Sequence, residues 1–313
     1  MDSKLRRDWR AIHSASETES LQKFALHCQG LKVRFGVGLS PYGAQVDFDE
    51  TAKAALKGKL AHLNRIGIDD LAILFDDMRG NFADLAHRQA EIVAFSVEHS
   101  NASRFFMCPT YYSTDPVLDR VFGARPTGYL EMLGKLLDPA ISVYWTGEEV
   151  CSRQYSIGHL ADIAEQLGRK LSLWDNYPVN DGPRMAGHLH LRAFTGRPAN
   201  AGQYVEHHAI NPASQPILGC IPALTLQRSY NEADMYCYGA AFLETSVAFC
   251  GAELASMLQT DLVLLQDCGL DRLGERRDML RQRYAAVDHP AAREIVDWLD
   301  GGYAITGELL QTQ

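Results

Sequence analysis

Short apolar runs alternate with amphipathic stretches over the first 220 residues of the chain. The run 71-LAILF-75 has five apolar residues in succession, which is typical of a strand buried on both faces of a parallel sheet. By the same criterion we expect five further strands, the last with the weakest pattern, over residues 31–41, 103–109, 140–147, 171–176 and 204–211. Apolar residues at helical spacing predict helices between the strands, over residues 51–67, 82–99, 127–137 and 156–168. These repeated strand–helix units predict a parallel sheet and an α/β fold.

Beyond about residue 230 the pattern changes to helices alone. The segment 233–258 is long and apolar on one face, and helical patterns follow at residues 275–287 and 290–300. The last of them has a proline in its first turn, a position that tolerates the missing N–H group. We therefore expect two regions, an α/β region over residues 1–225 and a helical C-terminal region over residues 226–313.

Composition and charge narrow the range of partners. The chain has 313 residues and a net charge of −9 at neutral pH, without a run of Lys or Arg, so we expect no nucleic-acid partner. No apolar stretch approaches the length of about 20 residues that a membrane span requires, which predicts no membrane partner. The N-terminus is charged and has no signal-peptide pattern. The seven cysteines are dispersed and never spaced CxxC, which favours reduced thiols and a cytoplasmic location.

Polar and aromatic side chains follow the predicted strands at their C-terminal ends, where sheets of this class place active sites. Asp76 and Asp77 come directly after the run 71-LAILF-75. Neighbouring residues of a strand point to opposite faces, so both acids can face one site only if the chain already turns there. The other strand ends supply the residues Cys108, Thr110, Tyr112, Trp145, Thr146, Trp174, Asn176, Asp181 and Asn211. Acids, amides and aromatic rings together suit a sugar, which offers hydroxyl groups and apolar ring faces.

The order of these motifs resembles glycoside hydrolase family 84, the O-GlcNAcases and related β-N-acetylglucosaminidases. The motifs are ILFDD, CPTxY, WTG, WDNxxxxD and NP, in sequence over roughly residues 2–225. The resemblance implies a (βα)₈ TIM-barrel catalytic domain and retaining cleavage of β-linked N-acetylglucosamine (GlcNAc). It also implies a GlcNAc-containing glycoconjugate or glycoprotein as the substrate, with no cofactor and no metal.

The same resemblance implies catalytic roles for the two acids. Asp76 would orient and polarise the 2-acetamido group of the substrate, and Asp77 would be the general acid/base that protonates the leaving oxygen. The acetamido oxygen would act as the nucleophile and form an oxazoline intermediate, which is an exception to the usual two-carboxylate scheme. One carboxylate must then be anionic while its neighbour carries a proton, and the repulsion between close like charges favours that division.

The resemblance also implies five substrate-binding residues. Tyr112 matches a tyrosine near the acetamido group, and Trp174 matches a wall of its pocket. Asn176 matches an amide that contacts the acid pair and the acetamide region. Asp181 and Asn211 match the residues that hold the distal hydroxyl groups of the sugar.

Two strands of the family barrel have no counterpart in the sequence. The family barrel begins with a strand that ends in a GFYG-type motif and a second that ends in an APK-type motif, whereas residues 2–14 resemble the segment after that lysine. We therefore expect a barrel without its first two strands, and an in-frame upstream segment that encodes them. Two open sheet edges would remain, which predicts poor solubility or a homodimer formed through them.

Two other functions stay open from the sequence. Asp76 and Asp77 could bind Mg²⁺ in a metal-assisted hydrolase, or the chain could be a non-catalytic remnant that binds glycans. Two histidine pairs have a spacing that suits zinc, but no acid or cysteine accompanies them; they are His188 with His190, and His207 with His208.

Overall fold

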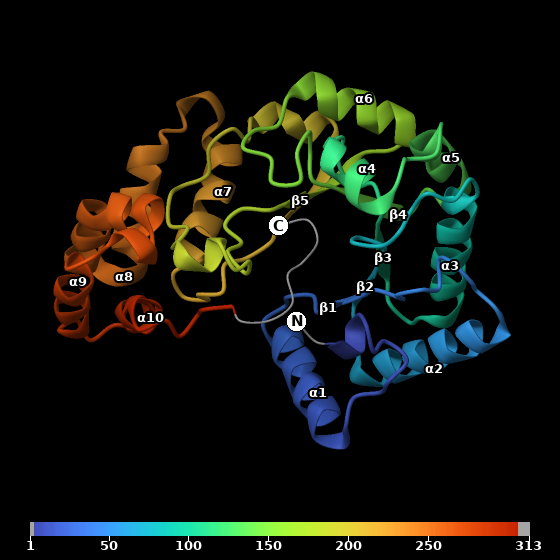
Figure 1. Cartoon of the computed structure of the whole chain (residues 1–313), viewed down its shortest axis with the longest axis horizontal. Helices are drawn as coiled ribbons and strands as arrows, with labels where there is room; N and C mark the ends of the chain where they lie inside the picture. The colour runs from blue at the N-terminus through green and yellow to red at the C-terminus, as the bar shows by residue number, and fades with distance from the viewer. Residues whose placement is uncertain (1–2, 306–313) are drawn as a thin grey trace.

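A parallel six-stranded sheet forms the centre of the computed structural model, which describes residues 3–305 (Figure 1). The strands follow one another in chain order and each pairs with the next in parallel. They are β1 (Gly36–Leu39), β2 (Asp70–Leu74), β3 (Arg104–Cys108), β4 (Ile141–Trp145), β5 (Leu171–Asp175) and β6 (Val205–Ile210). All six predicted strands are confirmed, including the weakest, at residues 204–211.

Helices connect successive strands and lie on the outer side of the curved sheet (Figure 1). These outer helices are α2 (Glu50–Ile66), α3 (Leu85–His99), α5 (Tyr129–Leu136) and α6 (Ile157–Leu167), and a further short helix, α4 (Pro116–Phe122), lies between β3 and α5 in the chain. The four predicted helices are confirmed, and α2 ends at Gly67, whose φ of 88° lies in the left-handed region that glycine adopts at low cost.

The apolar pattern did not identify α1 (Ala15–Gly30), which precedes β1. This helix buries only Ala25 and Cys28, so its sequence has no continuous apolar stripe. A capping box at Ser14 and Glu17 marks its start, because each side chain accepts a hydrogen bond from the backbone N–H of the other residue. The cap was therefore the one local signal for α1.

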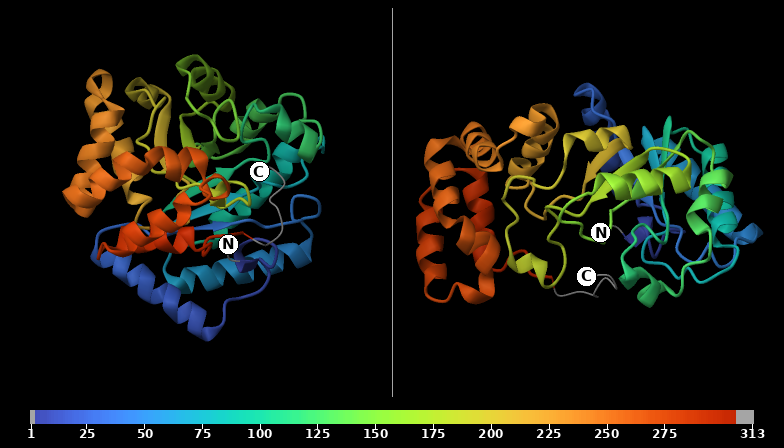
Figure 2. Two further views of the ribbon diagram at one scale, coloured as in Figure 1. Left: turned by 60° about the vertical axis from the view of Figure 1, so that its left-hand side comes forward. Right: turned by 90° about the horizontal axis from the view of Figure 1, so that it is seen from above.

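The described residues form two hydrophobic cores. The first lies between the sheet and its outer helices, where alternate strand residues such as Leu71, Ile73, Val143 and Leu173 are fully buried. The second lies within the helical region, which occupies the opposite end of the molecule (Figures 1 and 2). Its helices are α7 (Cys220–Glu232), α8 (Tyr238–Leu262), α9 (Arg276–Ala285) and α10 (Pro290–Leu299).

The segment between β5 and β6 attaches the helical region to the sheet. Trp298 of α10 is fully buried and donates a hydrogen bond from Nε1 to the carbonyl of Ala186 at 3.0 Å. Gln266 accepts hydrogen bonds from the backbone N–H groups of Leu191 and Arg192. Helix α7, absent from our sequence prediction, spans the expected boundary at residue 225. The boundary itself stays a prediction.

One helical stretch corrects the expectation that no segment is long enough to cross a membrane. Helix α8 continues through the π-helical segment Val263–Cys268, and the 31 residues from Tyr238 have a mean hydropathy of 1.3 in their most apolar window, which is 28% buried. Length and composition alone are weak evidence for a span. The backbone is also non-helical at Gly251 (φ 81°, ψ 162°), which interrupts the helical hydrogen bonds that a lipid environment requires.

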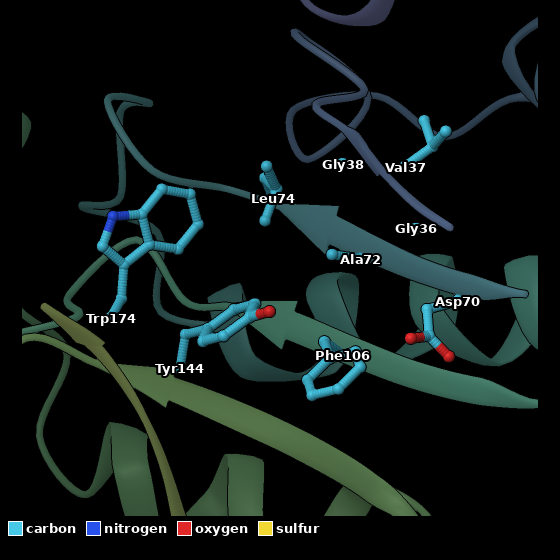
Figure 3. A pocket seen from close by; sticks show the side chains of 9 residues that line it. All are labelled: Gly36, Val37, Gly38, Asp70, Ala72, Leu74, Phe106, Tyr144 and Trp174. Carbon is cyan, nitrogen blue, oxygen red and sulfur yellow. The ribbon is translucent and has the colours of Figure 1, made fainter. Parts of the chain in front are cut away.

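The inner face of the sheet is partly open. Side chains from alternate strand positions, among them Leu74, Phe106, Tyr144 and Trp174, line a cavity of about 310 Å³ there (Figure 3). Strands β1 and β6 are the two ends of the sheet within residues 3–305. The structure thus shows an α/β fold with an open parallel sheet, and the closed eight-stranded barrel stays a prediction.

We expect the chain to associate with itself through these two edges. An edge strand presents a row of unpaired N–H and C=O groups, and exposed apolar residues beside it strengthen the tendency to pair. Sedimentation velocity over a wide concentration range is the measurement, and we expect the average mass to rise with concentration. A monomer at every concentration would contradict the expectation.

Candidate active site

The turn that follows β2 explains how two neighbouring acids face one site. Phe75 is fully buried, and its N–H donates to the carbonyl of Cys108 at 2.9 Å, which prolongs the pairing with β3 by one residue. The chain then turns at Asp76 and Asp77. Asp77 has a φ of 55°, a left-handed conformation that aspartate tolerates better than most residues. The alternation of strand side chains ends there, and both carboxylates face the same cation.

That cation is Arg6, which the sequence analysis did not identify. Its guanidinium donates from NH1 to Oδ2 of Asp76 at 2.9 Å and from NH2 to Oδ2 of Asp77 at 3.1 Å. NH2 also lies 3.3 Å from the carbonyl of Asp76. The Arg6 side chain is only 12% exposed. Burial opposes its charge, but the charges and hydrogen bonds of the two acids raise the pKa of Arg6 above its ordinary value.

One carboxylate oxygen of the acid pair lacks a hydrogen-bond donor within residues 3–305. Oδ1 of Asp76 is buried and accepts no hydrogen bond from residues 3–305. On the other acid, the hydroxyl of Tyr112 lies 3.5 Å from Oδ1 of Asp77, at the outer limit of a hydrogen bond. A buried carboxylate oxygen without a donor is costly, and such an atom points to a ligand that supplies the missing N–H or O–H.

Buried hydrogen bonds hold the turn in place from behind. Thr110 donates to the carbonyl of Phe75 at 2.9 Å, and Gln89 of α3 donates to the Thr110 hydroxyl at 2.9 Å. Gln89 in turn accepts a hydrogen bond from the hydroxyl of Tyr129. Because all four residues are fully or almost fully buried, the backbone before Asp76 has little freedom to move.

Cys108, at the end of β3, is a buried thiol beside the acid pair. Burial raises its pKa well above the ordinary value, and the charges of Asp76 and Asp77 raise it further. The thiol therefore stays protonated, and Cys108 is not poised as a nucleophile.

A second cluster of predicted residues lies at the ends of β5 and β6. Oδ1 of Asn176 accepts hydrogen bonds from Nε1 of Trp174 at 3.1 Å and from Nδ2 of Asn211 at 3.0 Å. Nδ2 of Asn176 donates to the carbonyl of Val150 at 2.7 Å. These bonds fix the orientation of the amide, and Trp174 also lines the inner cavity beside Tyr144 (Figure 3).

The loop after β4 contacts both clusters. Thr146 donates its N–H to the carbonyl of Tyr112 at 2.9 Å, and the carbonyl of Val150 receives the amide of Asn176. The predicted residues that follow the five strands β2 to β6 thus belong to one connected edge of the sheet. Asp181 lies beyond this edge, where it lines a cavity of about 810 Å³ together with Asn176 and residues of the helical region such as Tyr238.

A buried ion pair supports the residue that precedes Asn176. Asp175 is fully buried and pairs with Arg197, whose NH2 lies 2.6 Å from Oδ1. His208 contacts the other carboxylate oxygen at 3.0 Å, and the hydroxyl of Tyr230 lies 2.8 Å from its second ring nitrogen. Burial by itself would raise the pKa of Asp175, but the hydrogen bonds from His208 and Arg197 outweigh it and lower that pKa.

Three of the side chains considered in the sequence analysis, Trp145, His188 and His208, form hydrogen bonds within the protein. Trp145 is fully buried and donates from Nε1 to Nε2 of His159 at 3.0 Å, so it faces α6. Of the two histidine pairs, His188 contacts the carbonyl of Gln266 and His208 contacts Asp175. Within residues 3–305, no group of three or more His, Cys, Asp or Glu side chains is placed to hold a metal ion.

Comparisons relate the chain to known proteins. A sequence-family model described as beta-N-acetylglucosaminidase matches residues 1–258. The mouse protein O-GlcNAcase is 28% identical over 206 residues, which cover 63% of this chain and 22% of the mouse protein. The chain therefore spans about a fifth of the length of that curated relative.

Two solved structures share the fold. A point mutant of the O-GlcNAc hydrolase of Thermobaculum terrenum superposes with a TM-score of 0.77 at 23% identity, and covers 97% of this chain and 73% of its own. The protein CpGH84B superposes with a TM-score of 0.73 at 21% identity, and covers 96% of this chain and 59% of its own.

We expect Arg197→Met to destabilise the chain by about 3–5 kcal/mol at neutral pH, because it removes the guanidinium from the buried Asp175 carboxylate and leaves it with His208 alone. Arg192→Met is the matched control: it removes the half-exposed pair with Asp267 and should cost about 1 kcal/mol or less. Urea unfolding measures both. An equal loss of unfolding free energy in the two variants would contradict the larger stabilisation that we assign to the buried pair.

The same pair predicts a pH dependence. The folded state lowers the pKa of Asp175 from its ordinary value of 3.8. The ionised Asp175 therefore contributes its full stabilisation of the fold above pH 3.8, and this stabilisation is lost as the pH falls through the lowered pKa. The stability difference between the parent chain and Arg197→Met should therefore shrink below about pH 4. A difference that grows on acidification would contradict this assignment.

Proposed function

The chain belongs to the beta-N-acetylglucosaminidase family, glycoside hydrolase family 84, and we propose on this basis that it is a retaining β-N-acetylglucosaminidase. It cleaves β-linked GlcNAc with help from the acetamido group of the substrate and passes through an oxazoline intermediate. The substrate is a GlcNAc-containing glycoconjugate, such as a glycoprotein.

The observation that carries this proposal is the unequal surroundings of the two acids. Asp76 has one oxygen bound to Arg6 and one buried oxygen without a donor. The acetamido N–H of a bound GlcNAc is a donor of the right chemistry for that oxygen. Such a hydrogen bond orients the acetamide and makes its carbonyl oxygen more nucleophilic, as the proposed role of Asp76 requires.

Asp77 is assigned to proton transfer. As the acetamido oxygen attacks the anomeric carbon, the bond to the leaving oxygen breaks and Asp77 gives that oxygen its proton. Water then opens the oxazoline while Asp77 takes a proton back. Two displacements on the same carbon restore the original configuration, so the β linkage yields the β sugar.

The other predicted residues surround the sugar in this assignment. Tyr112 stands beside Asp77, at the acetamido end of the site. Trp174 holds Asn176, whose amide is fixed by three hydrogen bonds. Asn211 and Asp181 are assigned to the distal hydroxyl groups, and Asp181 lines the cavity of about 810 Å³ that opens next to Asn176.

The Mg²⁺ alternative is less well supported. A guanidinium already contacts one oxygen of each acid, so a metal ion would have to displace Arg6 or share its ligands.

The glycan-binding alternative assumes the same sugar site as the preferred function, and it differs only in that the bound glycan is not hydrolysed. A cytoplasmic location is consistent with seven free cysteines, three of them buried, and the homodimer stays a prediction.

We expect Asp77→Asn to separate substrates by their leaving groups. On a GlcNAc glycoside with a poor leaving group, kcat/KM should fall about 10²–10⁴-fold, because that oxygen needs a proton as it departs. On an activated aryl glycoside the loss should be much smaller. Equal losses on both substrates would contradict the role of Asp77 as the general acid.

Asp76→Asn is the companion variant in the same assays. It should slow both substrates, since it weakens the support of the cyclising acetamide whatever the leaving group is. Parent activity is measured with and without a chelator: loss on chelation would favour the Mg²⁺ alternative, and binding of GlcNAc without turnover would favour the remnant. An unchanged rate of Asp76→Asn on the activated substrate would contradict its role.

A further inference from the structure

We propose that Arg6 is a positioning residue for the acid pair. Its guanidinium holds one oxygen of each carboxylate, so that Oδ1 of Asp76 stays directed toward the acetamido group of the substrate. This inference depends on the function proposed above. Nothing in the sequence motifs assigns a role to Arg6.

The geometry suits a guanidinium and no other cation. Two terminal nitrogens of one planar group contact two different carboxylates at 2.9 and 3.1 Å, and NH2 also reaches the carbonyl between them at 3.3 Å. Arginine presents its donors in a rigid fork, whereas the ammonium group of lysine is a compact point charge. A lysine at this position could compensate charge without setting the angle between the two carboxylates.

The N-terminal segment delivers Arg6 from a fixed backbone. On one side of it, the carbonyl of Leu5 accepts a hydrogen bond from the N–H of Ser40, directly after β1, at 2.8 Å. On the other side, Trp9 is fully buried and donates from Nε1 to the carbonyl of Tyr42 at 3.0 Å. Arg6 lies between these two anchors. Its approach to the acids is therefore part of the folded structure and not one conformation of a loose tail.

The charges around the acid pair show why such a residue is needed. Within residues 3–305, the titratable groups that face the two acids include Arg6, the hydroxyl of Tyr112 and the buried thiol of Cys108. Of these three groups, Arg6 carries the positive charge. Two adjacent carboxylates repel each other, and without Arg6 their side chains would turn apart whenever both are charged. The alignment of Oδ1 of Asp76 would then be lost.

The test compares Arg6→Gln with Arg6→Lys and with Arg10→Gln. Arg10 belongs to the same segment but stacks on the ring of Trp9, with its guanidinium carbon 4.4 Å from the ring centroid. Arg6→Gln should lower kcat about 10²-fold on activated and poor leaving groups alike, with a small change in KM, because misplacement of a catalytic group by about 1 Å has that effect. Arg6→Lys should recover a part of the loss, and Arg10→Gln should match the parent.

A gain of activity in Arg6→Gln would overturn the proposal, since it would show that Arg6 blocks the site. A loss no greater than that of Arg10→Gln would also overturn it. A double-mutant cycle in thermal unfolding tests the contact without turnover: the Tm shifts of Arg6→Gln and Asp76→Asn should be non-additive, because both remove the same ion pair. Additive Tm shifts would show that Arg6 and Asp76 do not interact in solution. A parent chain that hydrolyses neither substrate, with a non-additive cycle, would instead reject the proposed function and leave the Arg6 contact standing.

Discussion

Two adjacent carboxylates at the end of a buried strand must be kept close together, and the ion pairs with Arg6 are what allow this. Like charges at this distance repel, and the left-handed backbone at Asp77 adds its own cost. The guanidinium offsets the repulsion with hydrogen bonds to both acids. The chain of hydrogen bonds from Gln89 through Thr110 to Phe75 then prevents the turn from relaxing. The strained part of the molecule is thus supported from the N-terminal segment and from α3.

The curved parallel sheet brings the remaining site residues to the same edge. Each strand ends at a similar height because successive strands pair in parallel, so their C-terminal loops are neighbours. The loop after β4 joins the acid cluster to the amide cluster through Thr146 and Val150. Behind the amide cluster, the buried pair of Asp175 and Arg197 fixes the end of β5. The sugar-binding assignment needs this rigidity, since each residue has to meet one face of a small ring.

Much of this architecture could be predicted from the sequence, for identifiable reasons. The strands were predictable from their apolar runs, and even the weak run at residues 204–211 proved to be β6. The expectation that the run 71-LAILF-75 is buried on both faces was wrong, because in β2 only alternate residues are fully buried and the inner face is partly open. Strand geometry indicated that Asp76 and Asp77 could face one site only in a turn, and the structure shows that turn, with a left-handed backbone at Asp77. The motifs also identified the residues around Asn176, although not that Trp174 and Asn211 would hold its amide in place.

Other features depend on long-range contacts that local pattern does not contain. Arg6 lies 70 residues from Asp76 in sequence, and nothing distinguishes it from Lys4 or Arg7 until the segment is folded. Helix α1 escaped detection because it buries too little apolar surface, and Trp145 could be placed in the core only once its contact with His159 was known. The sequence pattern ended the long apolar helix at residue 258, whereas in the structure it continues through Val263–Cys268.

The central claim is that the substrate supplies its own nucleophile while Asp76 holds it in place. The most direct test compares kcat/KM for an aryl β-GlcNAc glycoside with that for the matching aryl β-glucoside, which differs only in the 2-acetamido group. Without that group the nucleophile itself is missing, so the account predicts a near-total loss on the glucoside, larger than any one binding contact could explain. Comparable hydrolysis of the two would contradict substrate assistance and would point to a nucleophile on the enzyme.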